Sequence, residues 1–484
     1  MISLHGNDWK YGEIKMNVAK KLKRTIVFLL KITLFASIFA IFFGIFGIDN
    51  AWLFNFSRTS GVTMLTFAVL GIALMSIYGG YAIGVQKSKP IIYSMVLATI
   101  ITDLVTHLQL CIMNAGDTKY GRFVYEAPHL LLLTIILQII VIIIFAYLGN
   151  FIYFSLEPPE SCCLISSSSE SLGNIIPKIR RFKKQYAIKE KIHFSDEDVF
   201  SAIDRNDTIF LYDVPIEKRM EFVDYCYQHD KNIYYNFEMC DIVAMGAKFA
   251  IIDDKSLVSH TVKELTFEQR TIKRLIDILF SLIGVILTLP FMLIAAIAIK
   301  CDDGGKIFYK QKRLTKYGRI FQVLKFRTMR EENSIHMSVT ENDERITRAG
   351  NILRKFRIDE LPQLFNILMG DMTIVGPRPE MLENVARYTD SLPEFAYRLR
   401  AKAGLTGLAQ ISGKYNTSPK DKLVMDLMYI EKFSIWQDFK IMFQTITVFF
   451  KASESTEAFK DKVVYEFDKK ESSEEADESL TEEV

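Results

Sequence analysis

The sequence lacks the cysteine and histidine patterns of disulfide frameworks and zinc sites. Its 484 residues include six cysteines, with one vicinal pair, Cys162-Cys163, and no Cys-x-x-Cys spacing. The seven histidines show no metal-ligand spacing. These absences argue against a disulfide framework and a structural zinc site, and they fit a reducing cytoplasmic compartment.

The chain also lacks an excess of charge of either sign. Its 59 Lys and Arg residues nearly balance its 57 Asp and Glu residues, for a net charge of +2. Nothing in that balance indicates a nucleic-acid partner. By contrast, 50% of the residues are hydrophobic, and the chain is longer than a single core usually serves. We therefore expect two or three domains and a membrane component.

The first 156 residues are expected to form a transmembrane segment of four helices. Each of four apolar runs is long enough to cross about 30 Å of hydrocarbon; they lie near 25–48, 62–84, 91–113 and 129–154. Basic residues precede the first run and occupy the 85–90 loop, so the positive-inside rule places the N-terminus and everything after residue 155 in the cytoplasm. Asp103 and His107, within the third run, are either a functional site or a polar contact between packed helices.

Residues 157–265 are predicted to form a small cytoplasmic α/β domain with a parallel, Rossmann-like sheet. After the short apolar run Cys162–Ile165, strand-like and helical stretches alternate. The expected strands are Thr208–Tyr212, Asn232–Tyr235 and Phe249–Ile252, and the expected helices are 173–187, 196–204 and 216–229. Serines 166–169 stand where a nucleotide site needs a glycine-rich turn, so the sequence gives little support for nucleotide binding here. Asp196-Glu197-Asp198 matches a metal-binding D-x-D pattern, but a helix start is favoured.

A fifth apolar run, Ile278–Ile299, contains Pro290 and has basic residues on both sides. A full crossing would place the second basic flank outside the cell, and Pro290 would kink a helix. We therefore expect a re-entrant helix over about 276–299 that enters the membrane, bends and returns.

The next segment is a basic hairpin with predicted strands 306–313 and 319–328. Its positive charges suit phospholipid head groups or a substrate phosphate. They are Lys306, Lys310, Lys312, Arg313, Lys316, Arg319, Lys325, Arg327 and Arg330. Membrane anchoring is the expectation for most of them, and Lys325–Met329 is the better candidate phosphate site.

Two adjacent carboxylates, Asp359 and Glu360, open a predicted helix over Ile358–Leu368 that Gly370 ends. A carboxylate at a helix N-terminus faces unpaired N–H groups and the positive end of the dipole, which keeps it ionised and fixed in direction. These properties suit a nucleophile and equally suit an ordinary N-cap, so the pair alone leaves both open.

Further motifs follow the carboxylate pair. Gly370–Glu380 holds Arg378 between Pro377 and Pro379, and Gly404–Lys414 is punctuated by glycines like a loop that closes over a ligand. Ser434–Phe450 is amphipathic and suits either the membrane interface or the core. Residues 461–484 are expected to be an acidic, disordered tail.

Taken together, these motifs resemble the bacterial sugar transferase family, the monotopic polyprenyl-phosphate phosphoglycosyl transferases. The matching pieces cover roughly 270–452: Lys325–Met329, Asp359–Leu368, Gly370–Pro379, Gly404–Gly413 and Asp426–Tyr429. The front half looks like the large subgroup that includes undecaprenyl-phosphate galactose and glucose phosphotransferases. The resemblance implies a catalytic domain over 266–460, placed on the cytoplasmic face of the bacterial inner membrane.

The resemblance also implies a reaction and roles for residues. A hexose phosphate would pass from a UDP-sugar to undecaprenyl phosphate, which starts exopolysaccharide, capsule or O-antigen repeat units. Asp359 would be the nucleophile and a ligand of Mg²⁺, and Glu360 a base or a helper beside the metal. Phosphate and substrate contacts would come from Lys325, Arg327, Arg354, Gln363, Arg378, Gln410 and Asp426, with Pro290, Pro377 and Pro379 in structural roles.

A second hypothesis from another class is a non-catalytic membrane scaffold for polysaccharide-assembly proteins. It would recruit them through the α/β domain and the acidic tail, and it has no need of the acidic pair. The identity of the sugar is not encoded in any residue that can be named, and the four-helix segment is a candidate homodimer interface.

Overall fold

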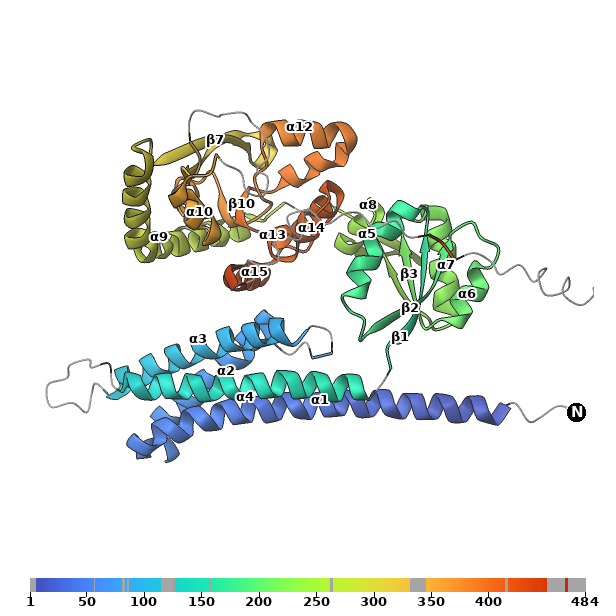
Figure 1. The fold of residues 1–484 in the computed structure, drawn as a ribbon, viewed down its shortest axis with the longest axis horizontal. Helices are drawn as coiled ribbons and strands as arrows, with labels where there is room; N and C mark the ends of the chain where they lie inside the picture. The colour runs from blue at the N-terminus through green and yellow to red at the C-terminus, as the bar shows by residue number, and fades with distance from the viewer. Residues whose placement is uncertain are drawn as a thin grey trace, which may run out of the picture. The chain divides into compact units, whose positions relative to one another are not determined.

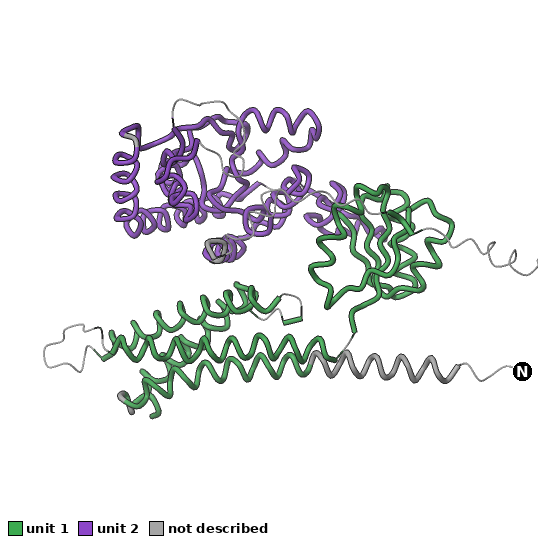
Figure 2. The backbone as a smooth tube through the Cα atoms, in the orientation of Figure 1, with its two compact units in different colours: residues 1–236, 460–484 green, residues 237–459 purple. Residues whose placement is uncertain are grey.

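The computed structural model describes residues 6–55, 57–80, 83–84, 87–114, 125, 127–156, 158–261, 264–330, 345–413, 417–450 and 466–468. The chain divides into two compact units, one of residues 1–236 with 460–484 and one of residues 237–459 (Figure 2). Of the predicted tail 461–484, only 466–468 belong to the described residues.

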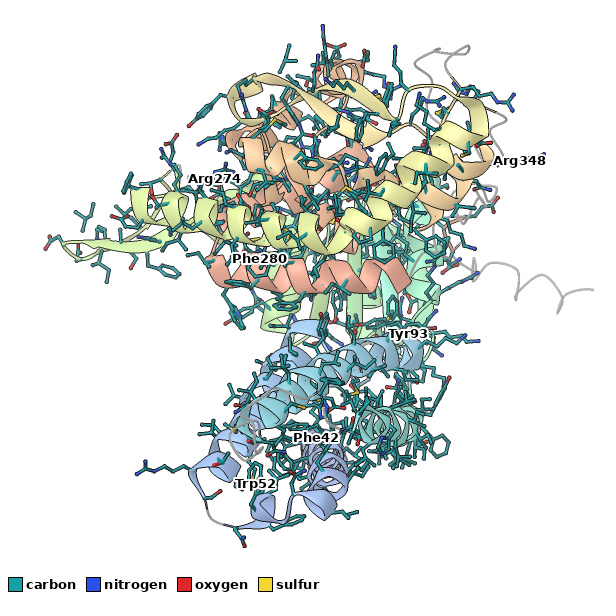
Figure 3. All side chains as sticks on the ribbon, turned by 90° about the vertical axis from the view of Figure 1, so that its left-hand side faces the viewer. Phe42, Trp52, Tyr93, Arg274, Phe280 and Arg348 are labelled. Atoms are coloured by element: carbon teal, nitrogen blue, oxygen red, sulfur yellow. The ribbon has the colours of Figure 1, made fainter. Side chains whose placement is uncertain are left out.

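The first unit begins with long apolar helices. They are α1 (Gly6–Asp49), the short turn η1 (Ala51–Phe54), α2 (Arg58–Tyr78), α3 (Ser88–Asn114) and α4 (Pro128–Ser155). By length and composition, parts of these four α-helices and of α9 in the second unit are able to span a membrane. Phe42, labelled in Figure 3, is fully buried and packs against the rings of Phe43 and Phe67. The length and composition of these helices indicate that the chain is a membrane-associated protein.

Asp103 and His107, in the middle of α3, lie on its buried face. Gln138 of α4 donates from Nε2 to Asp103 Oδ1 at 3.4 Å and to the carbonyl oxygen of Ile38 at 3.1 Å. The His107 ring packs against the ring of Phe46 at an interplanar angle of 39°, with 5.0 Å between the ring centroids. Of the two interpretations that the sequence left open, these contacts support polar packing between helices.

The remainder of the first unit contains an α/β domain (Figure 1). Its elements are β1 (Glu160–Ser166), α5 (Ser169–Arg180), β2 (Tyr186–His193), α6 (Val199–Arg205), β3 (Thr208–Tyr212), α7 (Ile216–Gln228) and β4 (Asn232–Tyr235). The strands are parallel in the order β2-β1-β3-β4. Cys163, Ile165, Ile209 and Phe222 are buried in its core, and the Ser168 hydroxyl caps α5 by accepting from the Ser171 N–H. Asp198 occupies the N-cap position of α6 without a side-chain capping hydrogen bond, so the D-x-D pattern lies at a helix start here.

Two predictions for this domain are wrong. The helix expected over 173–187 ends at Arg180, and a strand that the sequence reading missed, β2, begins at Tyr186. The stretch Phe249–Ile252 does not join the parallel sheet but forms a separate antiparallel hairpin with Lys255–Ser259. Asp253 at the turn has φ 58°, which suits a tight hairpin turn, and Phe249 is 94% exposed. The prediction treated an apolar run as buried, and burial is a tertiary property.

The second unit contains the carboxylate pair. Its elements are α8 (Met239–Gly246), β5 (Lys248–Ile252), β6 (Lys255–Ser259), α9 (Phe267–Asp303), β7 (Phe308–Leu314), η2 (Lys316–Gly318), β8 (Ile320–Phe326), α10 (Arg348–Lys355), η4 (Ile358–Glu360), α11 (Gln363–Met369), β9 (Thr373–Val375), α12 (Leu382–Ser391), η5 (Pro393–Arg400), β10 (Gly404–Thr406), α13 (Leu408–Ser412), α14 (Pro419–Glu431) and α15 (Ile435–Phe450). As predicted, β7 and β8 form an antiparallel hairpin. Strands β9 and β10 pair in parallel.

Helix α9 is one continuous helix that contains Pro290. Figure 1 shows that it bends between its two halves, and proline is a common cause of such a bend. In the first half, Asp277 accepts hydrogen bonds from the Thr373 hydroxyl and the Ile374 N–H. Phe280 packs edge-on against Phe439 of α15, below it in Figure 3.

The second half of α9 packs on the same unit. Met292, Ala295 and Ile299 are buried against Phe326 of β8 and Leu353 of α10. Both halves of the helix therefore contact one domain, whereas side chains such as Ile286, Leu287 and Ile294 between and beside these contacts are mostly exposed.

The side chain of Asn366 attaches α11 to β8. Its Oδ1 accepts from the Leu324 N–H at 2.9 Å, and its Nδ2 donates to the Gln322 carbonyl oxygen at 2.8 Å. The amide thus pairs with one strand as a neighbouring backbone would. Arg274 of α9 donates to the carbonyl oxygens of the next two residues, Ile367 and Leu368, near the C-terminal end of α11. These contacts fix the helix that follows the carboxylate pair.

Replacing Asn366 by Leu should destabilise the second unit by about 1–3 kcal/mol, because it leaves a strand N–H and a strand carbonyl without partners. The measurement is thermal or denaturant unfolding of the purified chain in detergent. Asn351→Ala on the exposed face of α10 is the control, and it should change stability by no more than about 0.5 kcal/mol. Equal effects of the two substitutions would contradict the role of Asn366.

Candidate active site

Asp359 and Glu360 lie in the short 3-10 turn η4, before α11. The predicted helix over Ile358–Leu368 is therefore wrong at its start: α11 begins at Gln363, after Pro362. Arg357, in the left-handed conformation at φ 54°, turns the chain into η4. Because Asp359 and Glu360 precede α11, the first turn of this helix does not account for the ionisation of the two carboxyl groups. The surrounding cations stabilise the ionised forms instead.

Two cations hold Glu360. Its Oε1 accepts from Lys325 Nζ at 3.2 Å and from Arg378 Nη2 at 2.8 Å, and its side chain is 16% exposed. Burial alone would raise the pKa of Glu360, but the charges of Arg378 and Lys325 outweigh burial and lower it well below its usual range. Glu360 is therefore an ionised carboxylate that fixes two cations, and the depressed pKa argues against the role of a base.

Asp359 differs from its neighbour. Among the described residues, none makes a side-chain hydrogen bond or ion pair with its carboxylate, and it is half-buried. Burial raises its pKa, and the negative charge of Glu360 raises it further. Lys325 and Arg354 act in the opposite direction. The expectation that a helix end keeps Asp359 ionised is thus replaced by a balance between burial and neighbouring charges.

The loop around Arg378 is stiffened on both sides. Pro377 and Pro379, for which a structural role was predicted, are buried. The Pro377 carbonyl oxygen accepts from the Gly404 N–H at 2.8 Å, and the Pro379 carbonyl oxygen accepts from Arg313 Nη1 at 3.0 Å. This loop therefore positions the Arg378 side chain toward Glu360.

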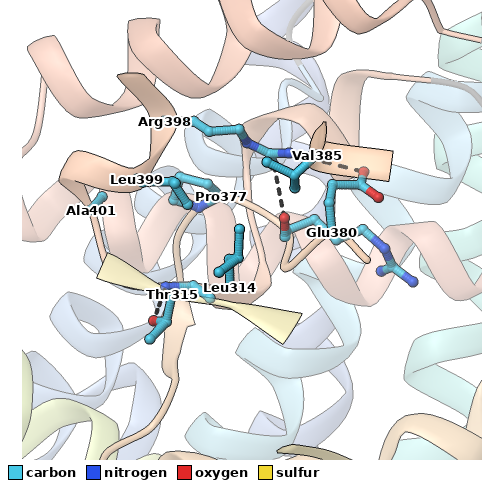
Figure 4. Close-up of a pocket in the computed structure, with 10 residues that line it drawn as sticks. Leu314, Thr315, Pro377, Glu380, Val385, Arg398, Leu399 and Ala401 are labelled. Carbon is cyan, nitrogen blue, oxygen red and sulfur yellow. Dashed lines mark hydrogen bonds and ion pairs between the residues drawn. The ribbon is translucent and has the colours of Figure 1, made fainter. Parts of the chain in front are cut away.

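Arg398 supports that loop from behind, beside a small pocket (Figure 4). Its Nη2 donates to the Arg378 carbonyl oxygen at 2.8 Å and pairs with Asp426 at 2.7 Å. Its Nη1 lies 4.0 Å from Glu380. Sequence reasoning missed Arg398, because one arginine in the irregular segment η5 carries no motif.

Asp426 was predicted to contact substrate, but the structure gives it a different place. It is 1% exposed and pairs with the buried Arg398. Burial raises the pKa of Asp426 to about 6, although the charge of Arg398 lowers it. Asp426 therefore acts on the site through Arg398 and the Arg378 loop.

The other predicted contact residues are Arg354, Arg327, Gln363 and Gln410, and among these Arg354 acts on Asp359 through its charge. Arg354 donates from Nε to Thr328 Oγ1 at 2.9 Å, and its charge lowers the pKa of Asp359. Arg327 is 6% exposed and donates to the carbonyl oxygen of Lys306, so its role in the structure is to join β8 to the start of β7. Gln363 is buried at the first position of α11. Gln410 donates to the Leu405 carbonyl oxygen.

The described residues contain no group of three or more His, Cys, Asp or Glu side chains that could hold a metal ion. Mg²⁺, however, is commonly bound by one or two carboxylates together with substrate phosphates and water. Asp359, without a side-chain partner among the described residues, fits that arrangement.

Comparison with known proteins identifies the second unit. A family model described as "Bacterial sugar transferase" matches residues 268–452. A UDP-glucose:undecaprenyl-phosphate glucose-1-phosphate transferase of Caulobacter vibrioides is 40% identical over 181 residues, which is 36% of this chain and 68% of that protein. The exopolysaccharide production protein ExoY of Sinorhizobium fredii is 38% identical over 191 residues, or 36% of this chain and 83% of that protein.

Other relatives are matched over less of their length. A UDP-N-acetylgalactosamine-undecaprenyl-phosphate N-acetylgalactosaminephosphotransferase of Aeromonas hydrophila is 40% identical over 180 residues, which is 36% of this chain and 43% of that protein. The matched region contains α9, the basic hairpin, the carboxylate pair and the Arg378 loop. On this evidence the chain belongs to the bacterial sugar transferase family.

Proposed function

We propose that this protein transfers a hexose 1-phosphate from a UDP-sugar to undecaprenyl phosphate, giving undecaprenyl-diphosphate-sugar and UMP. The observation that carries the proposal is the contrast within the carboxylate pair. Glu360 is fixed by Lys325 and Arg378, while Asp359 beside it has no such partner among the described residues. A family that includes undecaprenyl-phosphate sugar phosphotransferases gives this pair a reaction.

In the first half-reaction, an Asp359 carboxylate oxygen attacks the phosphorus that carries the sugar. The bond from this phosphorus to the bridging oxygen breaks, and UMP leaves with that oxygen and its electron pair. The product is a phosphosugar bound covalently to Asp359. An ionised carboxylate has no proton to lose, so no general base is required.

In the second half-reaction, a phosphate oxygen of undecaprenyl phosphate attacks the same phosphorus and displaces Asp359. Both substrates are anions, so the cations around the pair have charges to offset. Lys325, Arg354 and Arg378 come from β8, α10 and the loop after β9. Two substrates that use one nucleophile in turn give ping-pong kinetics.

The proposed cofactor is Mg²⁺, held by Asp359 together with phosphate oxygens of the donor. When bound, it would neutralise charge on the diphosphate and stabilise the leaving UMP.

The proposed location is the cytoplasmic face of the bacterial inner membrane, with α1–α4 as membrane-spanning helices and α9 as a re-entrant helix. Support comes from α9, because both of its halves pack on one domain and its exposed side chains are largely apolar. A re-entrant helix brings the site to head-group height, where a lipid phosphate and a soluble nucleotide sugar both reach it. Homodimerisation and contacts with other polysaccharide-assembly proteins are further proposals.

The second candidate function, a non-catalytic scaffold, does not explain why Lys325 and Arg378 lie beside Glu360. A scaffold has no need for a largely buried carboxylate held by two cations, beside a second carboxylate that has no side-chain partner among the described residues. The scaffold hypothesis predicts that the purified protein releases no UMP, although the strain that produces it assembles polysaccharide normally.

The test is a UDP-sugar panel with the full chain in lipid nanodiscs that contain undecaprenyl phosphate and Mg²⁺. We expect one or more UDP-hexoses to yield UMP together with an equal amount of lipid-linked sugar. Without undecaprenyl phosphate, we expect about one UMP per enzyme, as a covalent intermediate requires. Absence of UMP across the whole panel would refute the proposed function.

A further inference from the structure

Strand β2 is at the edge of the parallel sheet, since the strand order is β2-β1-β3-β4. Only one side of β2 pairs with β1, in the register Glu160–Tyr186 to Ser166–His193. The other side of an edge strand presents backbone N–H and C=O groups that can pair with another extended segment. This side of β2 is where a short piece of the C-terminal tail lies.

The described tail residues pair with Lys191 of β2. The Asp468 N–H donates to the Lys191 carbonyl oxygen at 2.9 Å, and the Lys191 N–H donates to Asp468 Oδ2 at 2.7 Å. The Lys191 ammonium donates to Asp468 Oδ1 and to the Glu466 carbonyl oxygen. Backbone and side chain of one lysine therefore both recognise the tail.

Phe467, between these two acidic residues, supplies the apolar part of the contact. It packs against a buried cluster of Leu164, Leu172, Ile176 and Ile179 from β1 and α5. Its ring also meets His193 edge-on, with 5.4 Å between ring centroids and an interplanar angle of 88°. The edge of β2 thus offers backbone pairing, a cation and an apolar surface to a segment of the pattern acidic–aromatic–acidic.

We propose that the outer edge of β2 is a peptide-binding site for extended acidic–aromatic segments, and that Glu466–Asp468 is its resident, displaceable occupant. Recognition of this kind, by strand addition, takes affinity from main-chain pairing and specificity from side-chain contacts. The described tail residues 466–468 belong to the first unit, although residues 237–459 before them form the second. A partner segment of the same chemistry would bind by displacing the tail.

In the structure the occupant is the tail of the same molecule, since the hydrogen bonds between Lys191 and Asp468 are made within one chain. Fifteen residues, 451–465, connect the end of α15 to Glu466, and such a connection spans up to about 50 Å when extended. A site joined to its ligand by a short connection faces a local ligand concentration on the order of 1 mM. The tail of a second molecule, present at micromolar concentration, competes poorly with a tethered tail at this local concentration.

The experiment measures binding of a fluorescent peptide of residues 461–472 to the full chain in nanodiscs. One form is unchanged, and the other carries Phe467→Ala and Asp468→Ala, which weaken the resident tail. The peptide should bind the tail-weakened form at least about tenfold more tightly, because the tail of the same molecule competes less well for the site. Equal binding to both forms, or binding to neither, would overturn the proposal.

A charge exchange tests the named residue. Lys191→Glu in the tail-weakened form should abolish peptide binding, and a peptide with Asp468→Lys should restore it. Lys189→Glu is the matched control, since Lys189 is an exposed lysine on the same strand, and it should leave binding unchanged. Loss of binding with Lys189→Glu but not with Lys191→Glu would contradict the assigned contact.

Hydrogen exchange separates the tail of the same molecule from that of a second copy. In the unchanged chain, protection of the Lys191 amide should be independent of protein concentration. Protection that falls on dilution would show that the occupant belongs to another molecule and would overturn the cis assignment. None of these measurements depends on transferase activity, so their outcome is independent of the proposed function.

Discussion

Asp359→Asn should lower UMP release from the preferred UDP-sugar by at least about 10³-fold, since an amide is a far weaker nucleophile than a carboxylate. The fold should tolerate the change, because the Asp359 side chain has no hydrogen bond or ion pair with another described residue and an amide has the same shape. Acid-quenched mass spectrometry should find the phosphosugar adduct on the peptide that contains Asp359 in the unchanged enzyme, and no adduct in the variant.

The control for this prediction is Asp390→Asn, a carboxylate that is exposed near the end of α12. It should leave both UMP release and the adduct unchanged. Asp359→Asn with turnover within about threefold of the unchanged enzyme would remove Asp359 from the role of nucleophile. In that case Glu360 would be no substitute, because its oxygen is already engaged by Lys325 and Arg378.

The carboxylate pair and its cations could be predicted because they belong to linear motifs. Lys325, Asp359, Glu360 and Arg378 lie in short stretches whose neighbours, two prolines and a helix-stop glycine, mark the local backbone. The structure brings three of them, Lys325, Glu360 and Arg378, together through charge-assisted hydrogen bonds. What the motifs did not reveal is the division of tasks, because both carboxylates look alike in sequence and differ only in their contacts.

The support behind the motifs could not be predicted. Arg398 and Asp426 lie 28 residues apart in the sequence, and their pairing exists only because η5 packs against α14. Likewise, β2 shows no alternation of apolar and charged residues, since Lys189, Glu190 and Lys191 are consecutive, and its first two residues were included in a predicted helix. In both cases the missing information was a tertiary contact, which no local pattern specifies.

The helix start was also misplaced, and the error is informative. A run of apolar residues at helical spacing suggested a helix from Ile358, but Arg357 and Pro362 divide the stretch into a 3-10 turn and a helix. The helix dipole was therefore the wrong explanation for an ionised pair. The charges of Lys325, Arg354 and Arg378 replace it, and charge can be tested by titration.

Glu360→Gln is expected to lower kcat/KM by about 10²-fold and to shift its pH dependence. The loss arises because Lys325 and Arg378 no longer share a charged acceptor, and hydrogen bonds to charged groups are worth about 1.5–3 kcal/mol each. The shift follows from Asp359. Its pKa is raised by burial and by the charge of Glu360, and only its ionised form attacks, so activity falls as the pH drops through that pKa.

Removing the charge of Glu360 lowers the pKa of Asp359, so the acidic limb of kcat/KM should move to lower pH in Glu360→Gln. Glu360→Asp is the matched control, because it keeps a negative charge beside Asp359 and should keep the limb near its original position. If Glu360 were instead a general base, the acidic limb would belong to Glu360 itself and would vanish in the Gln variant. An acidic side of the pH profile that is flat in Glu360→Gln would therefore reject the role of Glu360 as the anion that holds Lys325 and Arg378. A limb that moves but persists requires a second titrating carboxylate. Asp359 is that carboxylate, because the charge of Glu360 raises its pKa.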